Sequence, residues 1–145
     1  MRLRVVAVGK LKEAHYRDAV DDYLARIRRY VDVEEIELRD GAPSAVAAAM
    51  RKAIPARSEA VMLTIDGQAR SSEELAAYVG ARIDRAQDLT FVIGGADGIP
   101  QEIVATCRER LSLSRMTLPH RLARLLLVEQ LYRAMTIRRG EPYHH

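Results

Sequence analysis

Four short apolar runs, each separated from the next by a segment with helical spacing, constrain the fold of this chain more than any other feature. The runs are rich in valine and isoleucine, and they read LRVVAVG, VEEIEL, AVMLTID and LTFVIGG. Runs of this length and composition are typical of strands, whereas the segments between them repeat apolar residues every three or four positions. This alternation predicts an α/β fold, with a mostly parallel sheet and helices on both of its faces.

The helical segments also carry start and stop signals. The apolar stripe of the first begins at Tyr16, and in the second Ser44 is a candidate cap while Pro55 ends the helix. In the third, Ser71 and Glu74 have the spacing of a capping box. We therefore expect three helices, each of which buries one face.

The pattern changes after the fourth run. Pro100 suits the first turn of a short helix, and the segment from Leu111 to Pro119 alternates apolar and polar residues like a short strand. From His120 to about Arg138 the chain reads as one long helix, whose apolar residues cover more than half of its circumference. The outer helix of a small domain needs only one apolar stripe, so the excess predicts a partner helix, most simply from a second copy of the chain.

Composition narrows the class of protein. The 145 residues suit one domain, residues 1–145, and the longest apolar stretch is interrupted by charges, so we expect a cytoplasmic protein without a membrane span. The single cysteine, Cys107, excludes an internal disulfide and a multi-cysteine zinc site, and no histidine pair suggests another metal. Residues 108–145 hold eight arginines but only three glutamates, which indicates either a solvated face or a surface for a polyanion.

Two segments are unusual for simple connections. The loop from Gly94 to Gly98 follows a strand, but its glycines fit neither the dinucleotide fingerprint nor a P-loop, and Asp97 would repel a phosphate. The loop is therefore either a plain tight turn or a bare wall against which a flat ligand could lie. The segment from Leu113 to Leu118 is too apolar for a solvent loop, so it is either an edge strand or buried backbone that pairs with a ligand such as adenine.

From end to end the chain resembles the RlmH family, the SPOUT-class ribosomal RNA large subunit methyltransferases H. Four stretches carry the resemblance: LRVVAVGKLKE, LTIDGQARSSEELA, FVIGGADGI and LSLSRMTLPHRLARLLLVEQLYRAMTIRRGEPYHH. The resemblance implies an enzyme that transfers a methyl group from S-adenosyl-L-methionine to N3 of a pseudouridine in 23S ribosomal RNA. It also implies a homodimer packed through the last helix, and a C-terminal deep trefoil knot, which is a rare exception to the rule that chains do not knot.

The resemblance also assigns roles to residues of this sequence. It places the methyl donor against eight residues: Ile65, Gly94, Leu113, Ser114, Arg115, Met116, Thr117 and Leu118. The C-terminal tail is the candidate catalytic and RNA-binding segment, because Tyr143 could stack on a base and His144 belongs to the residue type that titrates near neutral pH. Arg138 and Arg139 join these two residues as candidate RNA contacts. Our hypothesis is that the tail of one subunit meets the donor bound to the other.

The chemistry makes limited demands on the protein. Transfer from a sulfonium donor is an in-line displacement that needs alignment, and the proton on N3 must leave, so a base or a group that stabilises the imidate would help. A chain this small without an added RNA-binding module is expected to recognise the shape of its substrate, which favours the assembled ribosome over free RNA. Two alternatives stay open: a SPOUT methyltransferase of another RNA, at a tRNA ribose or base, and a non-catalytic RNA-binding factor.

Overall fold

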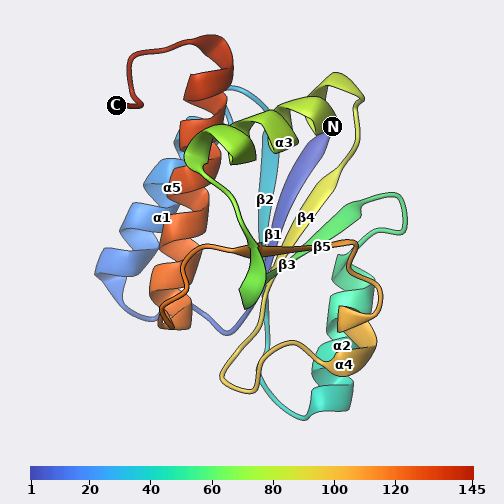
Figure 1. Cartoon of the computed structure of the whole chain (residues 1–145). Coiled ribbons are helices and arrows are strands. Elements are labelled where there is room, and N and C mark those ends of the chain that lie inside the picture. Colours follow the sequence, from blue (N-terminus) through green and yellow to red (C-terminus); the bar gives the residue numbers. More distant parts are fainter.

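Five parallel strands form one sheet at the centre of the computed structural model, which describes all 145 residues (Figure 1). The sheet order is β2-β1-β4-β3-β5, and every neighbouring pair is parallel. The strands are β1 (Arg2–Val8), β2 (Asp32–Leu38), β3 (Glu59–Ala69), β4 (Leu89–Ile93) and β5 (Glu109–Ser112). The predicted parallel sheet is confirmed.

Helices cover both faces of this sheet, as the alternating pattern predicts. They are α1 (Ala14–Ile27), α2 (Pro43–Ala53), α3 (Ser72–Asp84), α4 (Gln101–Val104) and α5 (His120–Arg139). The larger apolar cluster joins α1, α3 and α5 to one face, and the smaller cluster joins α2 and α4 to the other. Phe91 belongs to the larger cluster and Val92 to the smaller, because successive residues of a strand point to opposite faces.

The local start signals are confirmed in one helix and wrong in another. At α3, the Ser71 hydroxyl accepts a hydrogen bond from the Glu74 amide at 3.0 Å, and the Glu74 carboxylate accepts one from the Ser71 amide at 2.8 Å. Ser44, in contrast, does not cap α2. The helix already begins at Pro43, because proline is preorganised for the first helical position and has no amide hydrogen that needs a cap.

The strand expected between Leu111 and Pro119 lies earlier, at Glu109–Ser112, and the chain leaves the sheet at Leu113. The edge-strand alternative for the following residues is therefore wrong. The Ser112 hydroxyl donates to the Ser114 carbonyl at 3.0 Å, and the Ser114 hydroxyl accepts from the Met116 amide at 2.9 Å. Such local bonds between side chain and backbone compete with the sheet ladder and turn the chain away from it.

The end of β3 bends around β5. Leu111 is in register with both Leu63 and Gln68, so the residues between these two bulge out of the ladder with β5. At this bulge the backbones of β3 and β5 lie so close together that a Cβ on Gly67 would lie 2.8 Å from the carbonyl carbon of Arg110. Only glycine permits this approach. The trefoil knot, whose threading is expected in this C-terminal part, stays a prediction.

Candidate functional site

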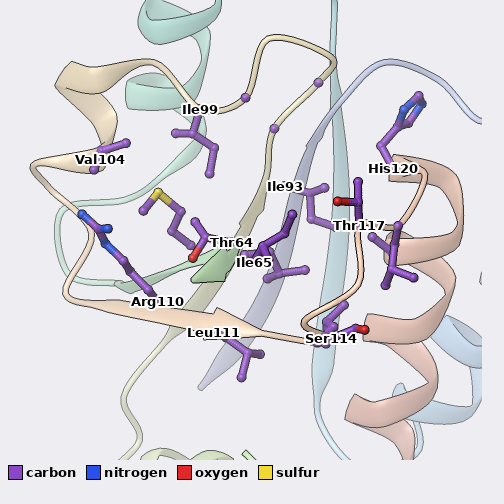
Figure 2. A pocket seen from close by; sticks show the side chains of 18 of the residues that line it. Thr64, Ile65, Ile93, Ile99, Val104, Arg110, Leu111, Ser114, Thr117 and His120 are labelled. Carbon is purple, nitrogen blue, oxygen red and sulfur yellow. The ribbon is translucent and has the colours of Figure 1, made fainter. Parts of the chain in front are cut away.

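A cavity of about 630 Å³ opens at the carboxyl end of β4 and beside the middle of β3 (Figure 2). This volume lies within the range of pockets that hold a cofactor or a small ligand. Its walls come from three segments: residues 62–65 in the middle of β3, the loop after β4 together with α4, and the chain from β5 to the first turn of α5. The two segments that are unusual in the sequence are therefore adjacent in space, as the family resemblance implies.

The glycine loop forms one wall and is a tight turn at the same time. The Gly98 amide donates to the Gly95 carbonyl at 3.0 Å, and Gly98 has a φ angle of +76°, which favours glycine. Gly94 faces this turn so closely that a Cβ on it would lie 2.6 Å from the Gly98 carbonyl carbon. The tight turn is confirmed, and its bare backbone faces the cavity, whereas contact of this wall with a flat ligand stays a prediction.

Seven of the eight predicted donor-binding residues line this cavity. They are Ile65, Gly94, Leu113, Ser114, Met116, Thr117 and Leu118. Arg115 is the exception, since it is exposed and does not line the cavity. Ile65 and Met116 are 51% and 78% exposed and are the two exposed large apolar side chains of the molecule, so a ligand in the cavity would cover apolar surface that is otherwise in water.

The cavity also contains residues that the sequence does not single out. Thr64 lies beside Ile65 in Figure 2, and its hydroxyl oxygen is buried without a hydrogen-bond partner. Buried hydroxyls normally have a partner, so this one is available to a polar atom of a ligand. His120, at the start of α5, lines the opposite side. The sequence carries no signal for Thr64, because a threonine inside an apolar run reads simply as part of a strand.

The charges around the cavity restrict what it can do chemically. Arg110 is the only arginine or lysine that lines it, and no carboxylate does. Bare backbone, apolar walls and an unpartnered hydroxyl suit a flat, partly polar ligand such as an adenosine moiety. A carboxylate base for the proton on a substrate nitrogen is absent from the cavity, so a base of that kind would have to come from another part of the protein.

The predicted catalytic tail lies far from this cavity within one chain. The cavity adjoins the start of α5, whereas the tail follows its end (Figure 1). A helix of the length of α5, 20 residues, spans about 30 Å. Tyr143 and His144 turn back along α5 as far as Glu129 and Arg133, and neither residue lines the cavity of its own chain.

The tail is held against α5 and α3 by specific contacts. Nδ1 of His144 lies 3.0 Å from a guanidinium nitrogen of Arg133, and Nε2 contacts the Glu73 carboxylate. A guanidinium can only donate hydrogen bonds, so Nδ1 must accept one from Arg133. Nε2 therefore carries the ring hydrogen and donates a hydrogen bond to the Glu73 carboxylate. Both ring nitrogens are thus occupied, and His144 can accept a proton only after it loses the contact with Arg133.

Tyr143 is packed in the same place. Its hydroxyl donates to Glu129 at 3.1 Å, and its ring meets the ring of Tyr132 edge-on at 4.7 Å between centroids. Burial, together with contacts to Tyr23 and Glu129, raises the pKa of the Tyr143 phenol. The phenol therefore stays neutral, which suits stacking and hydrogen-bond donation but not service as a base.

The two candidate RNA-binding arginines differ in their surroundings. Arg138 pairs with Asp84 on α3 at 2.6 Å. Arg139 has no carboxylate partner, and its guanidinium lies 4.8 Å from the ring centroid of Tyr30. Arg139 is therefore the freer of the two for an external anion.

A model of the family described as "Predicted SPOUT methyltransferase" matches residues 1–144. The chain is also 49% identical to the ribosomal RNA large subunit methyltransferase H of Sorangium cellulosum (strain So ce56), with 100% of both chains covered. The chain belongs to this family. It is 45% identical to the protein of the same name from Anaeromyxobacter dehalogenans (strain 2CP-C), with 99% of each chain covered. The predicted assignment is confirmed, and the protein is a ribosomal RNA large subunit methyltransferase.

Two solved structures show that the family fold is present in this member. One is a probable methylase family protein from Haemophilus influenzae Rd KW20, with a TM-score of 0.57 and 13% identity over 99% of this chain and 70% of that one. The other is a probable methyltransferase from Bordetella pertussis Tohama I, also with a TM-score of 0.57 and 13% identity, over 92% of this chain and 96% of that one. At this identity the likeness concerns the fold alone.

In this methyltransferase the cavity-lining start of α5 is anchored by a buried arginine. Arg124 is 1% exposed, donates to the Gly9 carbonyl at 2.9 Å, and pairs with Glu35 and Glu37 on β2. Arg17 on α1 pairs with the same two glutamates. The cluster ties α5 to β2 directly beside Ala123, which lines the cavity. In the sequence, Arg124 reads only as an interruption of an apolar run.

Proposed function

We propose that this methyltransferase transfers a methyl group from S-adenosyl-L-methionine to N3 of a pseudouridine in 23S ribosomal RNA, within the assembled ribosome. The observation that carries the proposal is the cavity, because it unites Ile65, Gly94 and most of the 113–118 segment. These positions come from distant parts of the sequence, and the family resemblance implies them as donor contacts. The family relationship supports the ribosomal RNA substrate.

The donor would lie between the glycine loop and the segment before α5. The bare backbone at Gly94 leaves room for a flat ring, and backbone amides and carbonyls of residues 113–118 would pair with the edge of the adenine. The Thr64 hydroxyl would donate to or accept from a polar atom of the same ligand. When bound, the sulfonium supplies an already activated methyl group, so the protein's part is alignment and removal of the N3 proton.

The proton would be taken by a group that the cavity itself lacks. His144 is our candidate, since loss of its Arg133 contact frees Nδ1 to accept a proton while Nε2 stays oriented by Glu73. Tyr143, kept neutral, would stack on the target base. Neither residue lines the cavity of its own chain.

The proposed solution to this separation is a homodimer. If two α5 helices pack antiparallel across a twofold axis, the tail of one subunit adjoins the cavity of the other. In a single chain, Leu122, Leu125 and Leu126 on α5 are only partly buried, which supports a partner on this helix. Each active site would then combine the donor cavity of one subunit with the tail of its partner.

The substrate is tested by incubating the protein with labelled donor and ribosomes that lack the modification, followed by mass mapping of the labelled nucleotide. The label is expected on N3 of a 23S pseudouridine. Label on tRNA but not on ribosomes would point to another SPOUT activity, and no donor binding at millimolar concentration would point to a non-catalytic factor.

The shared active site is tested by mixing two defective variants. One carries Gly94→Ala in the cavity wall, and the other lacks residues 141–145. In the mixed dimer one site has an intact cavity and an intact tail only if the tail acts on the partner's donor. Recovery of activity on mixing is therefore the expected result, and absence of recovery in a confirmed mixed dimer would show that each tail serves its own chain.

A further inference from the structure

Nearly every arginine on α1 and α5 has a carboxylate partner. The paired ones are Arg17, Arg26, Arg121, Arg124, Arg133 and Arg138. Three arginines at the ends of these helices differ: Arg28 and Arg29 directly follow α1, and Arg139 is the last residue of α5. All three are exposed and none makes an ion pair.

These three residues lie at the same end of the molecule and form what we call the tail-side arginine patch. Arg139 lies over the ring of Tyr30, the residue that follows Arg29 in the chain. The Tyr30 hydroxyl donates to Glu141 of the tail at 2.7 Å. In Figure 1 this is the upper end of α5, where the chain turns into its C-terminal tail. The patch therefore continues into the segment that holds the candidate catalytic residues.

The helix dipole does not account for the whole patch. Basic residues are favourable in the last turn of a helix, and Arg26 on α1 and Arg138 and Arg139 on α5 occupy such positions, whereas Arg28 and Arg29 lie beyond the end of α1. Arg28, Arg29 and Arg139 are exposed and make no ion pair, so their charges are available to a polyanion. The planar fork of a guanidinium matches the oxygens of a phosphate, and exposed, unpaired arginines gathered on one face are typical of nucleic-acid contacts.

We propose that the tail-side arginine patch binds backbone phosphates of the ribosomal RNA strand beside the target nucleoside. This inference rests on the proposed function, because it assumes that the tail meets RNA. It assigns a binding role to Arg28 and Arg29, just after α1, which the sequence does not single out. Arg138, an RNA-binding candidate from the sequence, already pairs with Asp84. We therefore assign the phosphate contacts mainly to the patch.

The test compares the double variant Arg28→Ala/Arg29→Ala with the wild type in binding to large ribosomal subunits that lack the modification, over a series of salt concentrations. We expect the Kd to rise about tenfold, and the slope of log affinity against log salt to fall by about 1 to 2, as expected for the loss of two phosphate contacts. Binding of S-adenosyl-L-methionine and the thermal unfolding midpoint should stay at wild-type values.

The matched control is Lys52→Ala/Arg108→Ala, which removes two exposed cations that also lack ion pairs but lie on α2 and just before β5. It should bind ribosomal subunits like the wild type. An unchanged Kd and salt slope in the α1 variant, or an equal loss in the control, would overturn the patch.

Methyl transfer by the wild type to the same particles is measured in parallel. A wild type that binds no donor and transfers no methyl group contradicts the proposed function, whereas a wild type that methylates while the α1 variant binds normally contradicts the patch alone.

Discussion

Gly94 and Gly98 face each other so closely that a Cβ on Gly94 would lie 2.6 Å from the carbonyl carbon of Gly98. The neighbouring atoms are backbone atoms of a tight turn, so they cannot move aside as the end of a side chain would. The wall of the cavity therefore has its present shape only with glycine at position 94.

Gly94→Ala should weaken binding of S-adenosyl-L-methionine by at least about tenfold, since the turn must shift by several tenths of an ångström and the cavity wall shifts with it. Calorimetric titration measures this effect. Gly41→Ala is the control, because a Cβ there meets no atom within 4 Å. Wild-type affinity in the Gly94 variant would mean that the loop does not contact the donor.

His144→Ala should lower the single-turnover rate of methyl transfer by about 10²- to 10⁴-fold, the usual contribution of a general base. Donor affinity should change little, because the proposed role of His144 is to accept the proton of the target base, and every residue that lines the cavity is unchanged. His145→Ala provides the control, since His145 is exposed and makes no side-chain hydrogen bond or ion pair. Equal rates in the two variants would remove His144 from the mechanism.

Arg124→Ala should lower the free energy of unfolding by about 2 to 3 kcal/mol, somewhat less than for a fully buried ion pair, because Arg17 still pairs with Glu35 and Glu37. Urea denaturation measures the change. Arg51→Ala removes an exposed pair with Glu102 and should change stability far less. If both variants unfold at the same urea concentration, the cluster does not anchor α5.

Glu59 should make the protein sensitive to acid. Burial raises the pKa of Glu59, but hydrogen bonds from Tyr78 and Arg82 outweigh it and lower the pKa below the ordinary value of 4.5. Since the unfolded chain binds this proton at higher pH than the folded one, the stabilisation is complete above about pH 4.5 and is lost as the pH falls through the folded pKa.

Denaturation of Glu59→Gln between pH 7 and pH 3 should therefore show a shallower loss of stability on the acid side than the wild type. Asp18→Asn, which changes an exposed carboxylate without an ion pair, should keep the wild-type profile. The same acid slope in the Glu59 variant and the wild type would contradict the assignment.

The periodic features of the sequence predict most of the fold, whereas the features that depend on local competition are harder to read. The strands and the full length of α5 follow from apolar spacing, and the α3 capping box follows from two residues three positions apart. The predicted end of the fifth strand was wrong because the side chains of Ser112 and Ser114 form hydrogen bonds with the nearby backbone. The alternation of apolar and polar residues in the sequence does not reveal such hydrogen bonds.

The candidate site divides in the same way. The glycine loop and the 113–118 segment stand out because each is unusual for a simple connection, and the family resemblance joins them. Thr64 does not stand out, since its importance comes from a missing hydrogen-bond partner, which exists only in three dimensions. Arg28 and Arg29 do not stand out either, because nothing in the sequence shows which arginines lack a carboxylate neighbour.

The three-part origin of the cavity has a consequence during protein synthesis. Its first wall, in the middle of β3, leaves the ribosome before the segment from Leu113 to Ala123, which completes the cavity. Because chains emerge from the N-terminus onward, a nascent chain without that segment lacks one wall of the cavity. A prematurely terminated copy of this enzyme would therefore lack the proposed donor site.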